Sequence, residues 1–134
     1  MVWIPTDVTI EEIEPGAELA GADLSGAELG GADLGGADIE GANLSGADLG
    51  GSCLADVNLA GANLENAVLR ESDLDGAVLQ DANLAGADLR GVSFPKLSNL
   101  SGADLSGATL EDGELPYADL SGATVRDANL KRVD

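Results

Sequence analysis

Carboxylate side chains occur at spacings that could support acid–base chemistry. Two pairs recur at the same sequence interval: Glu18 with Asp38, and Glu28 with Asp48. A fold that repeats at this interval would stack each pair on one face, at a separation near that of the paired acids of glycosidases. To act in catalysis, such a pair needs a cleft that excludes water and raises the pKa of one of the two carboxyl groups. The repeats described below predict a convex rod without a cleft, so we do not expect an enzyme.

The residue types that are missing exclude other chemistry. The chain has no His and a single Cys, Cys53, which excludes an internal disulfide, a thiolate zinc site and a His-based general base. Cys53 has no cationic neighbour in the sequence, so an inert thiol is expected. The glycines are not followed by the GK[ST] end of a phosphate loop. We therefore predict no catalytic residue, no cofactor and no metal site.

Composition restricts the partners. The 134 residues include 25 acidic and 6 basic side chains, for a net charge of −19. So few cations give almost no electrostatic support for direct binding to nucleic acid or to an anionic membrane. Residues 1–16 lack the features of a signal peptide, and acidic residues interrupt every stretch that could cross a membrane. We expect a single cytoplasmic domain.

A five-residue period organises the chain from Ala17 onward. Its central position is apolar in all 23 units, beginning at Leu19 and recurring by fives to Phe94, then from Leu100 to Leu130. The position two residues earlier is Ala in 17 units. Because five matches neither a helix at 3.6 nor a flat strand at 2, the backbone must bend once per unit.

The fifth position of each unit predicts a corner. Gly occupies it without interruption from Gly16 to Gly51, which suits the positive φ of a type II turn. Later units place Asn, Asp or other residues there, including Glu71 and Tyr117. Because these two tolerate a positive φ poorly, we expect a different, glycine-independent turn in many C-terminal units.

The units resemble a known family. Runs such as Ala22-Asp23-Leu24-Ser25-Gly26 are similar to the A(D/N)LXX signature of pentapeptide repeat proteins, over residues 17–132. The resemblance implies an all-β fold: a right-handed, four-sided β-helix with four units per coil. Recurrence after every four units supports four sides, since Asn43, Asn63 and Asn83 share one outward position. The repeats would then make nearly six coils, in a rod about 28 Å long.

The sequence divides into a short N-terminal cap (1–16), the β-helix (17–132) and a C-terminal tail (133–134). The spacing from Phe94 to Leu100 is six rather than five. This one-residue insertion near 95–97 predicts a Pro-led bulge that turns Leu97 or Lys96 outward.

Nothing in the sequence resembles a cover for the last leucine layer at the C-terminal end. We therefore predict contact with a second copy, giving a homodimer, although a truncated chain would explain the open end equally well. The resemblance supports dimers through this end. The candidate self-contact residues are Val125, Arg126, Leu130, Lys131 and Arg132.

Two functions fit an acidic rod. The first is a non-catalytic interaction or structural rod with a protein partner, whose acidity serves solvation or adaptation to high salt. The alternative, implied by the resemblance, is a DNA mimic that binds a type II topoisomerase, DNA gyrase, in competition with DNA. Its charge density of about 0.7 per Å is close to the value of about 0.6 for duplex DNA. The candidate acidic surface comprises Asp23, Glu28, Asp33, Asp38, Asp48, Asp73, Asp88 and Asp104.

Overall fold

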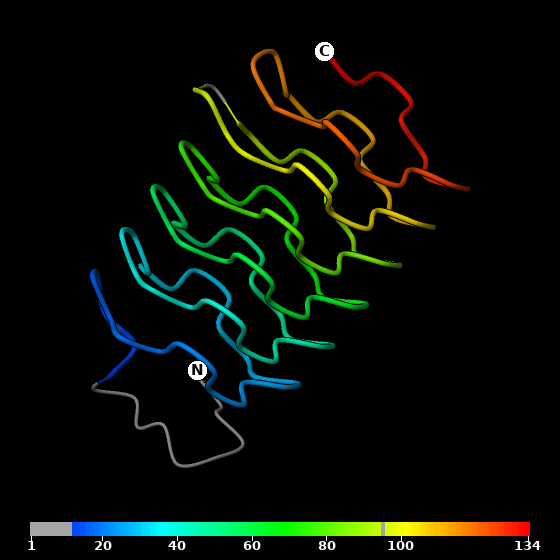
Figure 1. Cartoon of the computed structure of the whole chain (residues 1–134). Coiled ribbons are helices and arrows are strands. Elements are labelled where there is room, and N and C mark those ends of the chain that lie inside the picture. Colours follow the sequence, from blue (N-terminus) through cyan, green and yellow to red (C-terminus); the bar gives the residue numbers. More distant parts are fainter. Residues whose placement is uncertain (1–11, 95) are drawn as a thin grey trace.

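The computed structural model of the chain describes residues 12–94 and 96–134. This part of the backbone winds around one axis in stacked coils of similar shape, with its N-terminal residues at one end of the stack and its C-terminal residues at the other (Figure 1). Most of the predicted N-terminal cap lies outside the described residues. Of the part that is described, Ile13 packs against the core. No helix within the described ranges is long and apolar enough to cross a membrane.

The coils are joined by single-residue parallel bridges, and no longer strand occurs in residues 12–94 and 96–134. The first bridges join Glu18 to Asp38 and Asp23 to Asn43, so each residue pairs with its counterpart four repeats later. Four repeats therefore complete one turn, and each coil has four faces. We name these faces after their first inward leucines: the Leu19, Leu24, Leu29 and Leu34 faces.

Backbone hydrogen bonds run between coils in both directions. The inward Leu24 N–H donates to the Asn43 carbonyl at 2.7 Å, and the Asn43 N–H donates back to the Ala22 carbonyl at 2.9 Å. The corner residue Gly26 donates to the carbonyl of Ser45 at 2.9 Å. Because most of these bonds join neighbouring coils, a coil depends on its neighbours for backbone pairing.

The interior is filled by columns of leucine and alanine. From Leu24 to Leu110, every inward residue at the leucine position is at most 1% exposed. Where Val92 replaces the usual small residue, the next coil has Gly113, and a Cβ added there would lie 2.9 Å from the Leu110 carbonyl oxygen and 3.6 Å from Val92. The tight contacts come from its own coil, since the same Cβ would also lie 3.1 Å from Leu115 Cδ1, and they leave no space for a further methyl group.

The prediction of a glycine-independent turn in many C-terminal units is wrong. Glu71 has a φ of 54° and Arg132 one of 53°, close to the 64° of Gly51. Tyr117, in contrast, does not have a positive φ. The same left-handed corner is also adopted by Asp56, Asn66, Asp81, Asp112 and Asp127.

Stacking between coils explains several of these strained corners. The Asp56 carboxylate occupies the space that a Cβ of Gly76 would need in the next coil, and Asn66 does the same over Gly86. A non-glycine residue is therefore accommodated where the coil above it has glycine. The glycine leaves room for the side chain, while the left-handed φ still costs about 1–2 kcal/mol.

The insertion lies at the corner between the Leu34 and Leu19 faces. Bridge partners that lie on either side of it are one residue further apart in the sequence, from Val78 and Asn99 to Ser93 and Glu114, and the usual spacing returns from Asn99 and Asp119 onward. Phe94 and Leu100 on either side are both fully buried, whereas Leu97 is 81% exposed. The extra residue is thus accommodated outward, and both flanking core positions stay inside.

Candidate interaction surface

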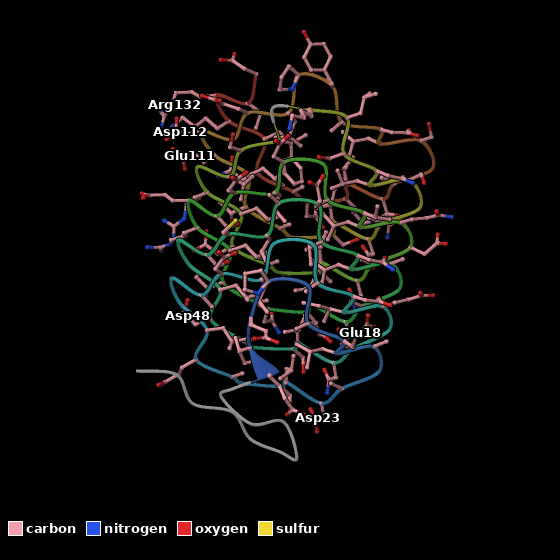
Figure 2. The ribbon with its side chains drawn as sticks, turned by 90° about the vertical axis from the view of Figure 1, so that its left-hand side faces the viewer. Glu18, Asp23, Asp48, Glu111, Asp112 and Arg132 are labelled. Atoms are coloured by element: carbon pink, nitrogen blue, oxygen red, sulfur yellow. The ribbon has the colours of Figure 1, made fainter. Side chains whose placement is uncertain are left out.

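The structure distributes the predicted acidic residues over all four faces instead of gathering them on one. Glu18, Asp23 and Asp48, for example, project in different directions from the N-terminal half (Figure 2). By face, the candidates are Asp38 on the Leu19 face, Asp23 and Asp104 on the Leu24 face, Glu28, Asp48 and Asp88 on the Leu29 face, and Asp33 and Asp73 on the Leu34 face. The surface they form is an acidic sleeve around the rod.

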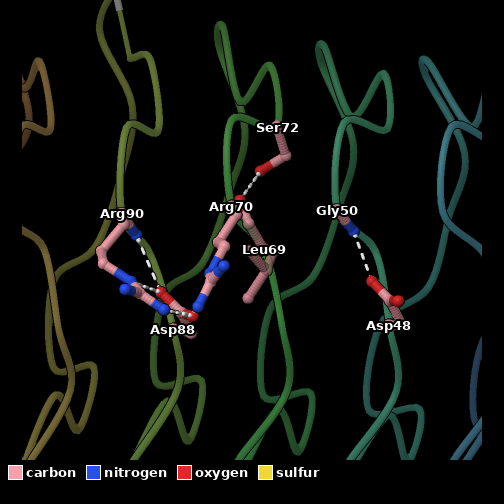
Figure 3. A network of polar contacts seen from close by, with 7 residues as sticks. All are labelled: Asp48, Gly50, Leu69, Arg70, Ser72, Asp88 and Arg90. Atoms are coloured by element: carbon pink, nitrogen blue, oxygen red, sulfur yellow. Dashed lines mark hydrogen bonds and ion pairs between the residues drawn. The ribbon is translucent and has the colours of Figure 1, made fainter.

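Many of these carboxylates also stabilise the backbone. Asp48 Oδ1 accepts the Gly50 N–H at 2.9 Å (Figure 3), and Asp33 accepts the Gly35 N–H at 3.1 Å. The Ser25 hydroxyl and N–H lower the pKa of Asp23. These Asx turns hold the acidic groups in fixed positions relative to the rod.

An amide ladder lies along the Leu24 face. The Asn83 side-chain N–H donates to Asn63 Oδ1 at 3.2 Å, Asn63 donates to Asn43 at 3.4 Å, and Asn43 donates to Asp23 at 3.4 Å. Each amide thus bridges two coils and places uncharged groups in the middle of this face. The ladder separates the acidic groups of Asp23 and Asp104.

The Leu29 face contains a network of paired charges. Arg90 binds Asp88 through two nitrogens, Nε at 2.8 Å and Nη2 at 2.6 Å. Arg70, from the preceding coil, binds the same carboxylate at 2.5 Å (Figure 3). One of the predicted acidic residues is therefore neutralised by two guanidinium groups.

A second ion-pair cluster joins the last two coils of this face. Arg132 binds Asp112 at 2.6 Å and Glu111 at 2.6 Å, and the three side chains lie together near the C-terminal end (Figure 2). The hydrogen bond from Arg132 lowers the pKa of Asp112. Arg132, predicted for self-contact, thus binds within its own chain.

The result is an electrically balanced region on an acidic molecule. Residues 67–71, 87–91, 108–112 and 128–132 contain four acidic and four basic side chains. A hollow of about 270 Å³ lies here, lined by Arg70, Glu71, Arg90, Gly91, Glu111 and Asp112. Four of these charged side chains bind residues beside the hollow: Arg70 and Arg90 bind Asp88, and Glu111 and Asp112 bind Arg132. Among the described residues, no group of His, Cys, Asp and Glu is arranged to hold a metal ion.

The last coil exposes part of the interior. Val125 and Leu130, both predicted for self-contact, are 44% and 48% exposed, and Leu120 on the same layer is 41% exposed. The other candidates Arg126 and Lys131 are exposed as well. Residues 133–134, predicted to be a tail, continue the pairing, since the Asp134 carbonyl accepts the Leu115 N–H at 2.7 Å.

Sequence reasoning missed the ion pairs between coils, two of which join residues one coil apart in the sequence. Lys96 binds Asp75 at 2.8 Å, at one residue more than the usual coil spacing because the insertion lies between them. Arg132 binds Asp112 at the usual coil spacing. Searching for opposite charges at this spacing, with one residue added across the insertion, would have found both pairs.

Comparisons with known proteins agree on one family. The pentapeptide repeats family matches residues 17–56, 52–91 and 98–134, with eight copies. No curated protein matches the chain. Among solved structures, HetL, a pentapeptide repeat protein involved in heterocyst differentiation regulation from Nostoc sp. strain PCC 7120, is 37% identical with a TM-score of 0.62. The alignment covers 88% of this chain and 59% of HetL.

A second solved structure is full-length QnrB1, a plasmid-mediated fluoroquinolone resistance protein. It is 25% identical with a TM-score of 0.56, over 85% of this chain and 63% of QnrB1. The chain thus spans about three fifths of the length of each of these proteins. Such neighbours form right-handed quadrilateral β-helices, the fold class expected from the repeats.

Proposed function

Because the chain belongs to the pentapeptide repeat family, we propose that it is a non-catalytic interaction rod with a protein partner. In this proposal the repeats form nearly six coils and residues 1–16 cap the first. The observation that carries it is the contrast between a filled interior, from Leu24 to Leu110, and the fixed acidic groups around it. A rigid rod that presents charges at set positions suits binding to a basic protein surface.

Neutralising the acidic sleeve tests this function. The variant combines Asp23→Asn, Asp33→Asn, Asp48→Asn and Asp73→Asn, which keep the side-chain oxygens that accept the turn N–H groups. A partner bound by the native chain in cells of the source organism should be lost from this variant, while the melting temperature stays near the native value. Equal capture of every partner by both proteins would contradict the proposal.

DNA mimicry is the second candidate. QnrB1, a fluoroquinolone resistance protein, shares the fold, and members that protect gyrase motivate the comparison. The Leu29 face contains the region of balanced charge, so a DNA mimic would have to present its negative charges on the three other faces. Such a mimic would inhibit gyrase supercoiling at moderate salt. Stability that rises up to molar salt, with no inhibition at any concentration, would leave only the general rod.

The open end suits a second copy in this proposal, through Leu120, Val125 and Leu130. Joining two ends would cover these side chains and pair the exposed backbone edge. Leu130→Asp should then convert a dimer to a monomer in sedimentation experiments. A native chain that is monomeric at all concentrations would exclude the end-to-end contact.

A further inference from the structure

One corner of the rod departs from the repeat in two successive coils. At the corner between the Leu34 and Leu19 faces the sequence reads Pro95-Lys96-Leu97 and, in the next coil, Pro116-Tyr117. Leu97 is 81% exposed and Tyr117 is 63% exposed. Elsewhere the corner positions of the repeats hold small, polar or charged residues. Large apolar side chains on this surface therefore need an explanation of their own.

These two side chains leave the rod next to each other. Asn99 and Asp119 are bridge partners, and Leu97 and Tyr117 each precede one of them by two residues. The two side chains therefore start from the same corner of adjacent coils. The open end does not explain the exposure of Leu97, because its own coil is covered by the next and Leu100 is fully buried.

The corner segments that carry Leu97 and Tyr117, here called the projection, are held in place in both coils. The Lys96 ammonium binds Asp75 of the preceding coil at 2.8 Å, which ties the inserted segment to the rod. In the following coil, Pro116 fixes one backbone dihedral before Tyr117, and the Ala118 N–H closes the turn onto the Leu115 carbonyl at 3.2 Å. Backbone held in this way loses little conformational entropy on binding.

Acidic residues frame the projection. Glu114 and Asp119 are exposed on the two faces that meet at Tyr117, and Asp73 is exposed on the Leu34 face below. A complementary surface would need an apolar pocket for the side chains and cations around it. A tyrosine at the centre of such a contact is typical of the few residues that dominate binding energy.

We propose that Leu97 and Tyr117 form the anchor by which the rod binds a protein partner, one with an apolar pocket rimmed by Lys and Arg. The proposal rests on the interaction-rod function and names the surface that this function uses. The acidic sleeve orients the partner, and the anchor supplies most of the specific affinity.

The first experiment uses a photoreactive side chain as the probe. p-Benzoylphenylalanine replaces Leu97 in one protein and Gln80, an exposed corner residue on another edge, in the control. In cells of the source organism, position 97 should give a discrete adduct with one protein, and Tyr117→Ser should remove it. An adduct with nucleic acid or with a second copy of the chain would overturn the proposal, and so would none at position 97.

The second experiment measures affinity with the purified partner. Leu97→Ser and Tyr117→Ser should each weaken binding by about tenfold or more, whereas Gln80→Ser should not. Melting temperatures should be unchanged, since both side chains are mostly exposed. If neither anchor variant weakens binding but the sleeve variant does, the anchor is wrong and the interaction rod stands. If no position yields a protein adduct and no partner is captured, both fail.

Discussion

The repeats in residues 17–51 and those in residues 52–134 differ at their corners and in their charges while sharing one kind of interior. The first segment has glycine at every corner, from Gly21 to Gly51, and contains seven acidic side chains and no basic one. The second contains all six basic side chains and places Asp, Asn, Glu and Arg at left-handed corners. Inward leucines are buried to the same degree in both, up to Leu110.

The difference distinguishes the residues that build the fold from the residues that give the surface its particular charges and contacts. Leucine and alanine columns with glycine corners suffice for the fold in the first segment, where no basic side chain offsets the repulsion between acids. In the second segment, several departures from the repeat have a compensating partner in a neighbouring coil. Gly76 over Asp56 and Arg132 beside Asp112 are two such partners.

The largest effect should come from the interior. Leu49→Ala in the first segment removes a side chain that is 1% exposed, and we expect a loss of about 2–5 kcal/mol in the free energy of unfolding. Leu130→Ala, on the same face but 48% exposed, should cost about 1 kcal/mol or less. Urea denaturation of the two variants measures the contrast. Equal losses would mean that the last coil is covered in solution.

Overpacking at Gly113 should follow in magnitude. An added methyl group would meet the Leu110 carbonyl at 2.9 Å, so Gly113→Ala should destabilise the chain by about 1–3 kcal/mol. Ser72→Ala in the same column is the control, because it loses only the hydroxyl bond to the Leu69 carbonyl (2.7 Å). A Gly113→Ala variant as stable as the native chain would show that the turn after Leu110 can shift to accept the methyl group.

Two glycine corners separate backbone strain from contact between coils. Gly61→Ala imposes only the left-handed φ of 64°, since nothing lies near its Cβ position, whereas Gly76→Ala also displaces the Asp56 carboxylate. We expect about 1–2 kcal/mol for the first and a larger loss for the second. Adding Asp56→Gly to Gly76→Ala should bring its cost down to that of Gly61→Ala. If the double variant is no more stable than Gly76→Ala, the explanation that Gly76 leaves room for Asp56 is wrong.

The smallest effect concerns pH at the last corner. Hydrogen bonding to Arg132 lowers the pKa of Asp112, so this pair stabilises the fold above the unfolded pKa of Asp112. The stabilisation is lost as the pH falls through the lower folded pKa. In Arg132→Ala, stability should change less on acidification, and the pKa of Asp112 measured by NMR should rise. Asp104, whose pKa is lowered by Ser106, should titrate as before.

The repeat made the interior predictable. Its period assigned Leu19 and its successors to the inside, and the recurrence after four repeats stacked Glu18 on Asp38, as the bridges confirm. These features follow from local pattern alone, because each unit repeats the same alternation of inward and outward residues.

The surface was predictable only in part. The corner at Glu71 was misjudged from intrinsic preference, because the glycine that leaves room for its side chain, Gly91, lies one coil away. The neutralisation of Asp88 by Arg70 and Arg90 likewise depends on side-chain reach across coils. A single repeat does not encode these relations, so the acidic candidates could be named but not their pairing.

The pairing of each repeat with its counterpart one coil later also constrains how such a chain can change in length. Duplicating a whole coil would leave every column on its original face. Duplicating a single repeat would rotate everything after it by a quarter turn and carry Leu97 and Tyr117 to a different side of the rod. A partner that binds this surface would therefore still bind a chain lengthened by a whole coil, but not a chain lengthened by a single repeat. The one-residue insertion before Ser98 lengthens the chain without turning the surface at all.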